Sequence, residues 1–179
     1  MTLDNDAVLT PRLRLEVLDQ PAVAALAAGG SLSELGHLDP YQAMTTAGHM
    51  LALRAAQLEE SPGTAPWLVR VIVERDTGAV VGYVNFHAPP DAEGMVEIGY
   101  QVVPEARRRG YATEAASAMW AWAGERGAQT LRASIRPDNE PSLALVQRAG
   151  FVHVGEEVDE IDGLELVYER RADRSISRR

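Results

Sequence analysis

Hydrophobic and polar residues follow two different periods along the chain, and this change of period separates predicted helices from predicted strands. Residues 12–17 alternate between charged and apolar side chains, as a half-buried strand does. Two helical segments follow. The first is capped by Asp19 and ends at Gly29, and the second spans about residues 41–59 and is rich in alanine, leucine and methionine. The segment between these two helices is spotted with glycine and serine and is predicted to be a loop.

β-Branched runs dominate the middle of the chain. Residues 67–74, 79–87 and 95–103 predict three strands joined by short turns. An i, i+3, i+4 stripe of apolar residues then predicts a helix over residues 111–126, with Gly127 after its end. The remaining predicted elements are a strand at 130–136, a helix at 138–149 and strands at 151–157 and 164–170. The order β-αα-βββ-α-β-α-ββ indicates an α+β fold.

Length and composition favour one soluble domain. The chain has 179 residues, 46% of them hydrophobic, which is enough for one ordinary core. No apolar run reaches about 18 residues, no signal peptide is recognisable, and cysteine is absent, so a cytoplasmic protein is expected. We expect a lead-in over residues 1–9, one domain over 10–170, and a basic, disordered tail over 171–179.

Charge is distributed unevenly. The formal net charge is −9, yet residues 170–179 contain five arginines and one aspartate. The rest of the chain therefore carries 12 arginines against 25 acidic residues, a net charge of −13. Such a body repels phosphate backbones, which argues against nucleic-acid binding and favours cationic partners. Acidity can equally serve solubility alone.

The most informative segment is a basic loop that turns directly into the helix at residue 111. Arg107, Arg108 and Arg109 precede Gly110, and Ala112 keeps the first helical turn free of bulk. Free N–H groups and the positive end of the dipole make a helix N-terminus an anion site, and Gly110 permits a close backbone approach. The alternative is an ordinary helix start beside a solvated basic loop.

Four landmarks in this region and around it resemble the GCN5-related N-acetyltransferases (GNAT). Arg107-x-x-Gly110-x-Ala112 resembles the family's R/Q-x-x-G-x-G/A signature, and residues 97–104 are similar to its fourth strand. Asn139-Glu140-Pro141-Ser142, followed by Gly150-Phe151, is similar to its N-x-x-S…G-F segment. The opening at residues 10–15 is typical of the branch that resembles the ribosomal-protein N-terminal (RimJ/RimL-like) acetyltransferases.

The resemblance implies a fold and a cofactor. The fold is a single domain with a mixed, mostly antiparallel sheet of about seven strands, flanked by about four helices, with a splayed fourth strand. Acetyl-CoA is the implied co-substrate, without a metal. Its pyrophosphate would lie on residues 108–113, its pantetheine arm along the fourth strand, and the N–H of Gln101 would polarise the thioester carbonyl. The residues expected to bind the coenzyme are Gln101, Val102, Val103, Arg107, Arg108, Arg109, Gly110, Tyr111, Ala112, Thr113, Asn139 and Ser142.

Two catalytic candidates also come from the resemblance. Glu97 falls where histone-type members place their general base, although it could instead be a structural carboxylate paired with an arginine. Many members carry a tyrosine, as general acid, five residues before the Phe of the G-F pair, but here that position is Val146. Ser142 is the nearest replacement on the same helix, unless it is only a first-turn serine. The histidines lack metal-ligand spacing and are expected to be structural or on the surface: His37, His49, His87 and His153.

These features predict an acetyl-CoA-dependent N-acetyltransferase acting on a primary amine by direct attack in a ternary complex. The amine could belong to a protein N-terminus, a lysine or a small molecule, and a noncatalytic acyl-CoA-binding sensor or partner-binding module is the alternative. No nucleic acid or membrane is expected as a partner, and both a monomer and a homodimer remain open. A cationic acceptor is suggested by acidic residues near the last hairpin and before the key strand, unless they are merely solvated: Glu156, Glu157, Asp159, Glu160, Asp162, Asp91 and Glu93.

Overall fold

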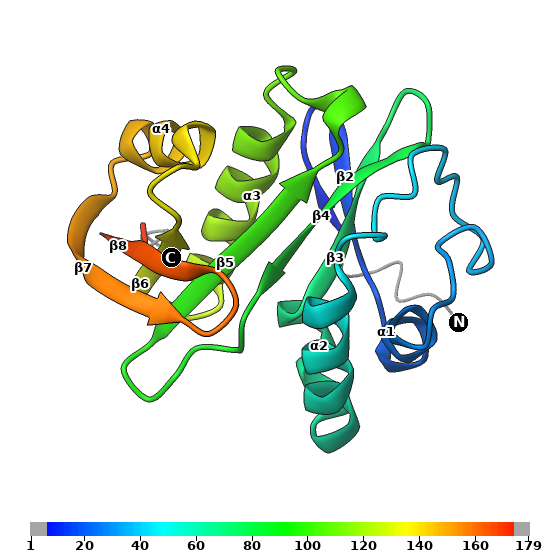
Figure 1. Cartoon of the computed structure of the whole chain (residues 1–179), viewed down its shortest axis with the longest axis horizontal. Helices are drawn as coiled ribbons and strands as arrows, with labels where there is room; N and C mark the ends of the chain where they lie inside the picture. The colour runs from blue at the N-terminus through cyan, green and yellow to red at the C-terminus, as the bar shows by residue number, and fades with distance from the viewer. Residues whose placement is uncertain (1–6, 174–179) are drawn as a thin grey trace, which may run out of the picture.

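A computed structural model of the protein describes residues 7–173 and contains one eight-stranded sheet in the order β1-β2-β3-β4-β5-β6-β8-β7 (Figure 1). The pair β5–β6 is parallel and the other pairs are antiparallel. This arrangement confirms the predicted mixed, mostly antiparallel sheet. The strands are β1 (Val8–Leu9), β2 (Leu13–Val17), β3 (Val69–Glu74), β4 (Val80–Phe86), β5 (Met95–Val102), β6 (Thr130–Ile135), β7 (Val152–Asp159) and β8 (Gly163–Arg171).

Helices cover both faces of the sheet (Figure 1). The pair α1 and α2 packs together on one side, whereas α3 and α4 lie on the other. The helices are α1 (Gln20–Ala27), α2 (Gly48–Glu60), α3 (Tyr111–Glu125) and α4 (Glu140–Arg148), with short 3-10 turns at Pro62–Trp67 and Pro104–Ala106. Within residues 7–173, no helix has the length and apolar character that a membrane span requires.

The apolar stripe of α3 packs on the even-numbered side chains of the central strands. Trp122 of α3 stacks near Phe86 of β4, with ring centroids 6.5 Å apart, and meets Trp67 edge-on at 4.7 Å. Val96 and Ile98 of β5 are buried on the same side of the sheet. Alternation along a strand then turns the odd-numbered side chains of β4 and β5 toward α2.

The two central strands part from each other along their length. β5 pairs with β6 only where Met95–Glu97 face Thr130–Arg132. Beyond that point β5 continues alongside β4, while β6 continues alongside β8. An opening therefore forms between the later halves of β5 and β6, which confirms the splayed strand that the sequence predicted as the fourth.

Local conformation explains where the predicted elements differ from the observed ones. The predicted helix at 41–59 begins only at Gly48 because Gln42 has a positive φ of 52° and Asp39 Oδ1 accepts the Ala43 N–H in a separate turn. Val8–Leu9, within the predicted lead-in, form β1 against β2, but two residues are too few to show a period.

At the C-terminal end, Arg171 completes β8 opposite Thr130, so the strand continues one residue into the predicted tail. The lead-in predicted for residues 1–6 and the disordered tail predicted for 174–179 lie outside the described residues.

Candidate active site

The basic loop enters α3 through two residues with left-handed backbone. Arg108 has a φ of 60°, and Gly110, the N-cap of α3, has a φ of 79°. Because Gly110 has no side chain, it cannot cap the helix, and no side chain bonds there. Among residues 7–173, the first-turn N–H groups of α3 have no side-chain cap, which is the arrangement that the predicted anion site requires.

A pocket of about 900 Å³ begins at this helix start and runs between α3 and α4 along the edge of β5. Its wall combines backbone of the loop, the end of β5 and one side of α4. The lining residues are Thr46, Tyr100, Gln101, Val102, Ala106, Arg107, Arg108, Gly110, Tyr111, Ala112, Thr113, Asn139, Pro141, Ser142, Ala144, Leu145 and Arg148.

The predicted coenzyme residues line this pocket with two exceptions, Val103 and Arg109. Val103 lies under the sheet edge, and its N–H donates to Val81 O at 2.9 Å. The Arg109 guanidinium lies 3.7 Å from a carboxylate oxygen of Glu74, away from the pocket. An arginine triplet in a tight turn cannot direct all its side chains to one place, so one of them is used to hold the loop.

The other two arginines differ in their bonding. Arg107 Nε donates to Val102 O at 3.0 Å and so ties the loop to the end of β5. Arg108 lines the pocket and, within residues 7–173, forms no ion pair with a carboxylate. Its charge is therefore available to a ligand.

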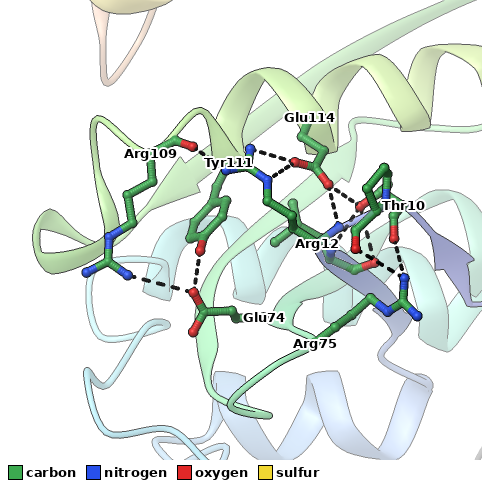
Figure 2. Close-up of polar contacts among 9 residues, drawn as sticks. Thr10, Arg12, Glu74, Arg75, Arg109, Tyr111 and Glu114 are labelled. Carbon is green, nitrogen blue, oxygen red and sulfur yellow. Dashed lines mark hydrogen bonds and ion pairs between the residues drawn. The ribbon is translucent and has the colours of Figure 1, made fainter.

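Residues from the start of the chain brace the loop (Figure 2). Glu114, in the first turn of α3, accepts bonds from the Thr10 hydroxyl at 2.6 Å and from the Arg12 N–H at 2.9 Å. The Arg12 guanidinium binds the same carboxylate and also donates to Arg109 O at 2.8 Å (Figure 2). The opening segment that resembles the family's is thus the part of the chain that fixes the helix start and its loop.

These bonds change the acidity of Glu114. Burial favours its neutral form, but the bonds from Thr10 and Arg12 outweigh burial and lower the pKa of Glu114 below its usual value. Glu74 has a lowered pKa as well, because the hydroxyls of Thr77 and Tyr111 donate to its carboxylate. Both carboxylates therefore remain charged through the neutral range and keep the loop in place.

The backbone groups of β5 alternate between the two neighbouring edges. His87 N donates to Glu97 O and Val103 N donates to Val81 O, so odd-numbered residues of β5 bond to β4. Strand alternation turns the Gln101 N–H toward Tyr83 of β4 as well. The N–H groups that face the opening belong to Tyr100 and Val102 instead, which differs from the prediction for Gln101.

The odd-numbered side chains of β5 form a second face under α2. Gln101 belongs to it through its side chain, whose Nε2 donates to Thr46 Oγ1 at 2.8 Å and whose Oε1 accepts the Tyr83 hydroxyl at 3.3 Å. Glu97 lies four residues earlier on the same face. Strand periodicity places positions 97, 99, 101 and 103 on one face, and the register of β5 on β4 sets Gly99 opposite Asn85 and Gln101 opposite Tyr83.

A buried polar chain links α2 to this face. Arg54 is only 7% exposed and donates from Nε and Nη2 to Asn85 Oδ1, both at 3.2 Å. Asn85 Nδ2 then donates to Gly99 O at 3.1 Å. Burial lowers the pKa of Arg54, and the charge of Glu97 opposes that shift. The chain fixes the backbone of β5 between Glu97 and Gln101.

Glu97 meets a histidine on this face. His87 Nδ1 lies 3.8 Å from Glu97 Oε2, whereas neither Arg54 nor Arg132 forms an ion pair with Glu97 among the contacts of residues 7–173. Arg54 and Arg132 interact with Glu97 electrostatically, but without the close contact of an arginine-paired carboxylate. The sequence assigned His87 to the structure or the surface, and no spacing in the sequence could have placed it beside Glu97.

The residues of the predicted acidic cluster do not all lie together; some of those on the hairpin β7–β8 lie close to His87. Glu157 of β7 stands opposite Glu165 of β8 in the strand register. Glu157 and Asp159 both act on His87 electrostatically. Glu165 was not among the predicted residues, yet burial and its acidic neighbours Asp162 and Asp159 raise the pKa of Glu165 to about 7.

Other members of that cluster have different positions. Glu156 alternates to the opposite side of β7 from Glu157. Asp91 Oδ1 accepts the N–H groups of Glu93 and Met95 and so shapes the β4–β5 turn. The acidic residues of this cluster that act on His87 therefore come from the last hairpin.

Val146, which occupies the position where many family members carry a tyrosine, is fully buried in the core. Ser142 lines the pocket, with its N–H bonded to the N-cap Asn139 at 3.3 Å. Beside it lies the Tyr100 hydroxyl, which the sequence did not single out. Burial raises the pKa of Tyr100, against a smaller opposite effect of Ser142, so its hydroxyl keeps its proton. Among residues 7–173, no group of three or more histidine or acidic side chains could hold a metal ion.

Comparison with protein families decides the assignment. Residues 12–152 match the model of the acetyltransferase (GNAT) domain. The chain belongs to the GNAT acetyltransferase family. Two GNAT relatives from Bacillus subtilis (strain 168) are the uncharacterized N-acetyltransferases YjdG and YoaA. YjdG is 29% identical over 80% of this chain and 88% of its own length, and YoaA is 30% identical over 82% of each.

Solved GNAT structures share the fold. The ribosomal-protein-S5-alanine acetyltransferase from Vibrio fischeri has a TM-score of 0.64 at 15% identity, covering 93% of this chain and 97% of its own. RimL, a ribosomal L7/L12 alpha-N-protein acetyltransferase solved with coenzyme A, has a TM-score of 0.64 at 17% identity, covering 93% and 98%. The microcin C7 self-immunity acetyltransferase MccE, solved with acetyl-CoA and AMP, has a TM-score of 0.63 at 16% identity, covering 90% and 93%. At these identities the likeness concerns the fold of this GNAT chain.

Proposed function

We propose that this protein is an acetyl-CoA-dependent N-acetyltransferase that moves the acetyl group directly onto a primary amine. One observation carries the proposal: the pocket at the uncapped start of α3 follows β5 to the opening beyond Glu97. The face under α2, called the acceptor-side face from here on because the amine would approach along it, begins there. Membership of the GNAT family and neighbours solved with coenzyme A or acetyl-CoA support it.

The donor would lie along the pocket. Its pyrophosphate binds the first-turn N–H groups of α3 and Arg108, and its pantetheine arm bonds the edge of β5 as an added strand would. The N–H groups of Tyr100 and Val102 face this arm and are positioned to polarise the thioester carbonyl. A backbone donor of this kind stabilises the tetrahedral oxyanion more than the ground-state carbonyl.

The reaction needs a neutral amine and a leaving thiolate. The amine lone pair adds to the thioester carbon, an oxyanion forms, and its collapse breaks the C–S bond and releases coenzyme A. Tyr100 and Ser142 lie where a hydroxyl could donate to that thiolate. A thiol pKa near 8.5 makes the thiolate a tolerable leaving group, so a hydrogen bond there suffices.

Deprotonating the acceptor amine requires more catalytic assistance than releasing the thiolate. At pH 7 it costs about 4–5 kcal/mol for a lysine-like amine with a pKa near 10.4, but only about 1 kcal/mol for a protein α-amine with a pKa near 7.8. Glu97 therefore belongs to the base machinery of the proposed reaction. Its contribution is largest if the acceptor is strongly basic.

We further propose a cationic acceptor. Glu97, Glu157, Asp159 and Glu165 lie on or beside the face from which the amine would approach, and such a field concentrates cations. Since salt screens this attraction, the KM for the acceptor should rise with ionic strength.

Two measurements test the function. Coenzyme A and acetyl-CoA should each raise the melting temperature, as ligands specific to the folded state do. A free-thiol assay should then detect turnover with acetyl-CoA and at least one acceptor among spermidine, Nα-acetyllysine amide, kanamycin and an alanine-initiated peptide, with the product checked by mass spectrometry. Coenzyme binding without turnover across that panel would support the noncatalytic sensor instead.

A further inference from the structure

We infer that His87 is the general base of the acetyl transfer, taking the acceptor's proton on Nε2 while Glu97 stabilises the resulting imidazolium. The inference rests on the proposed function and assigns to His87 a role that neither the signature motifs nor the family resemblance indicates.

The geometry begins with the pairing of two strands. His87 follows β4, and its N–H bonds to Glu97 O at 2.9 Å, so the two residues stand opposite each other. Facing residues of an antiparallel pair project to the same side, and His87 Nδ1 accordingly lies 3.8 Å from Glu97 Oε2. At this distance the carboxylate forms no hydrogen bond, but its charge favours a proton on the nearer nitrogen, Nδ1, and leaves Nε2 to accept.

Gly99 shows where the second nitrogen lies. A Cβ atom at Gly99 would lie 3.4 Å from His87 Nε2 and 3.0 Å from Asn85 Nδ2. The imidazole therefore leans along β5 over Gly99, toward Gln101 and the end of the donor pocket. Because Gly99 has no side chain, Asn85 and the His87 ring can both lie against the backbone of β5, two residues before the Gln101 end of the pocket.

Neighbouring side chains hold His87 in this position. Gln57 Nε2 donates to His87 O at 2.9 Å, and Arg54 Nη1 donates to Gln57 Oε1 at 2.9 Å. Arg54 also binds Asn85, so this one buried guanidinium helps to position both His87 and Asn85, the two residues whose side chains lie against Gly99. Arg54 and Gln57 are positioning residues in this scheme.

The charges that face His87 suit a base working near neutral pH. Crowding by the surrounding protein lowers the pKa of His87, Glu97 opposes that shift and Arg54 adds to it, while Glu157 and Asp159 oppose it. The net pKa of His87 is below its ordinary value near 6.5, so the ring is neutral at pH 7 and able to accept. Once it is protonated, the three carboxylates attract it.

The proton balance closes without a further reactant. The acceptor ammonium gives one proton to His87 Nε2 and the freed lone pair attacks the thioester carbon. As the tetrahedral intermediate collapses, the nitrogen loses its second proton to the departing thiolate, and coenzyme A leaves as the thiol. About half of the His87 side chain is exposed (49%), so solvent takes the proton and restores the neutral ring.

The test compares His87→Gln with His153→Gln in the full chain, using the acceptor in the panel that is turned over and has the highest pKa. His153 is a matched control, since it is also an exposed histidine, on β7, with a ring contact to Tyr168. We expect His87→Gln to lower kcat by about 10²-fold, the low end of general-base effects, with an unchanged thermal shift by coenzyme A. His153→Gln should keep wild-type turnover.

The pH profile separates a base from a structural histidine. For the wild type, kcat/KM should rise through the His87 pKa and then stay level up to the acceptor's pKa. For His87→Gln it should rise about tenfold per pH unit, because only the amine already neutral in solution reacts. Glu97→Gln should retain the wild-type form of the profile, with its lower limb moved to lower pH.

Opposite outcomes overturn the assignment. A His87→Gln variant with the wild-type profile, or a Glu97→Gln variant that alone loses the lower limb, would make Glu97 the base. Wild-type protein that turns over no acceptor would contradict the proposed function itself, and His87 with it.

Discussion

Gly110 and Gly127 stand at opposite ends of α3 in the same left-handed backbone, with φ of +79° and +95°. Replacing either by valine imposes the same kind of strain, roughly 1–2 kcal/mol. We expect only Gly110→Val to abolish the rise in melting temperature on adding coenzyme A, because only this residue lies where the phosphates would approach the backbone. Differential scanning fluorimetry measures both the strain and the ligand shift.

Gly127→Val isolates the effect of strain. A Cβ there would meet nothing within 4 Å, whereas at Gly110 it would lie 3.3 Å from Arg12 Nη2. If the two variants lost the coenzyme shift equally, or Gly110→Val retained it, the anion site would not be at the start of α3.

At the scale of one element, α3 depends on a carboxylate that the first strand supplies with hydrogen bonds. Glu114→Gln should lower the free energy of unfolding by about 1–3 kcal/mol at pH 7, the range for hydrogen bonds to a charged group, and weaken coenzyme binding. The lowered pKa of Glu114 means that its stabilisation is complete above the ordinary glutamate value, about 4.3, and is lost as pH falls through the lower folded value.

Chemical denaturation at several pH values measures this effect. The difference between wild type and Glu114→Gln should shrink in the acid range below pH 4.3. Glu105→Gln removes the same charge from the exposed turn before the loop and is the control. A difference that stayed constant with pH would show that the carboxylate's charge does not hold the helix.

The elements that could be predicted from sequence are those with a local cause. Asp19 caps α1 with a bond to the Ala22 N–H, as expected from a capping residue before an alanine-rich stretch. The start of α3 after Gly110 could also be predicted, because the basic loop, the glycine and the helix are contiguous in the sequence.

Other parts depend on pairing between distant segments. His87 lies beside Glu97 only because of how β4 and β5 are aligned. The same alignment bonds the odd-numbered residues of β5 to β4, so the N–H groups of Tyr100 and Val102 face the opening. A shift by one residue would exchange the two faces, and composition does not fix that shift. Arg109 likewise lies outside the pocket because its guanidinium is drawn to Glu74, a residue distant in the sequence.

At the scale of the whole molecule, the acidic acceptor side should couple binding to proton release. The pKa of Glu165 is about 7, so the group is about half protonated at neutral pH. A cation bound beside it favours the carboxylate, and spermidine should therefore release up to about half a proton at pH 7. Isothermal calorimetry in buffers of different ionisation enthalpy measures that release.

Glu165→Gln should remove the proton release, and Glu156→Gln, on the opposite side of the hairpin, should leave it unchanged. Spermidine binding with equal heat in all buffers would mean that the cation does not approach Glu165.

Where β5 parts from β6, the two sides of the opening are formed by different segments of the chain. One side of the opening is built by the loop before α3 and by α4, and the other by α2 and the hairpin β7–β8. If the proposed function holds, substitutions in α2 and the hairpin should therefore alter which amine is accepted without weakening the binding of the acyl donor. Such a division makes the scaffold evolvable: new acceptor preferences can be tried one residue at a time, away from Arg54 and Gln57, while the binding of the carrier is kept.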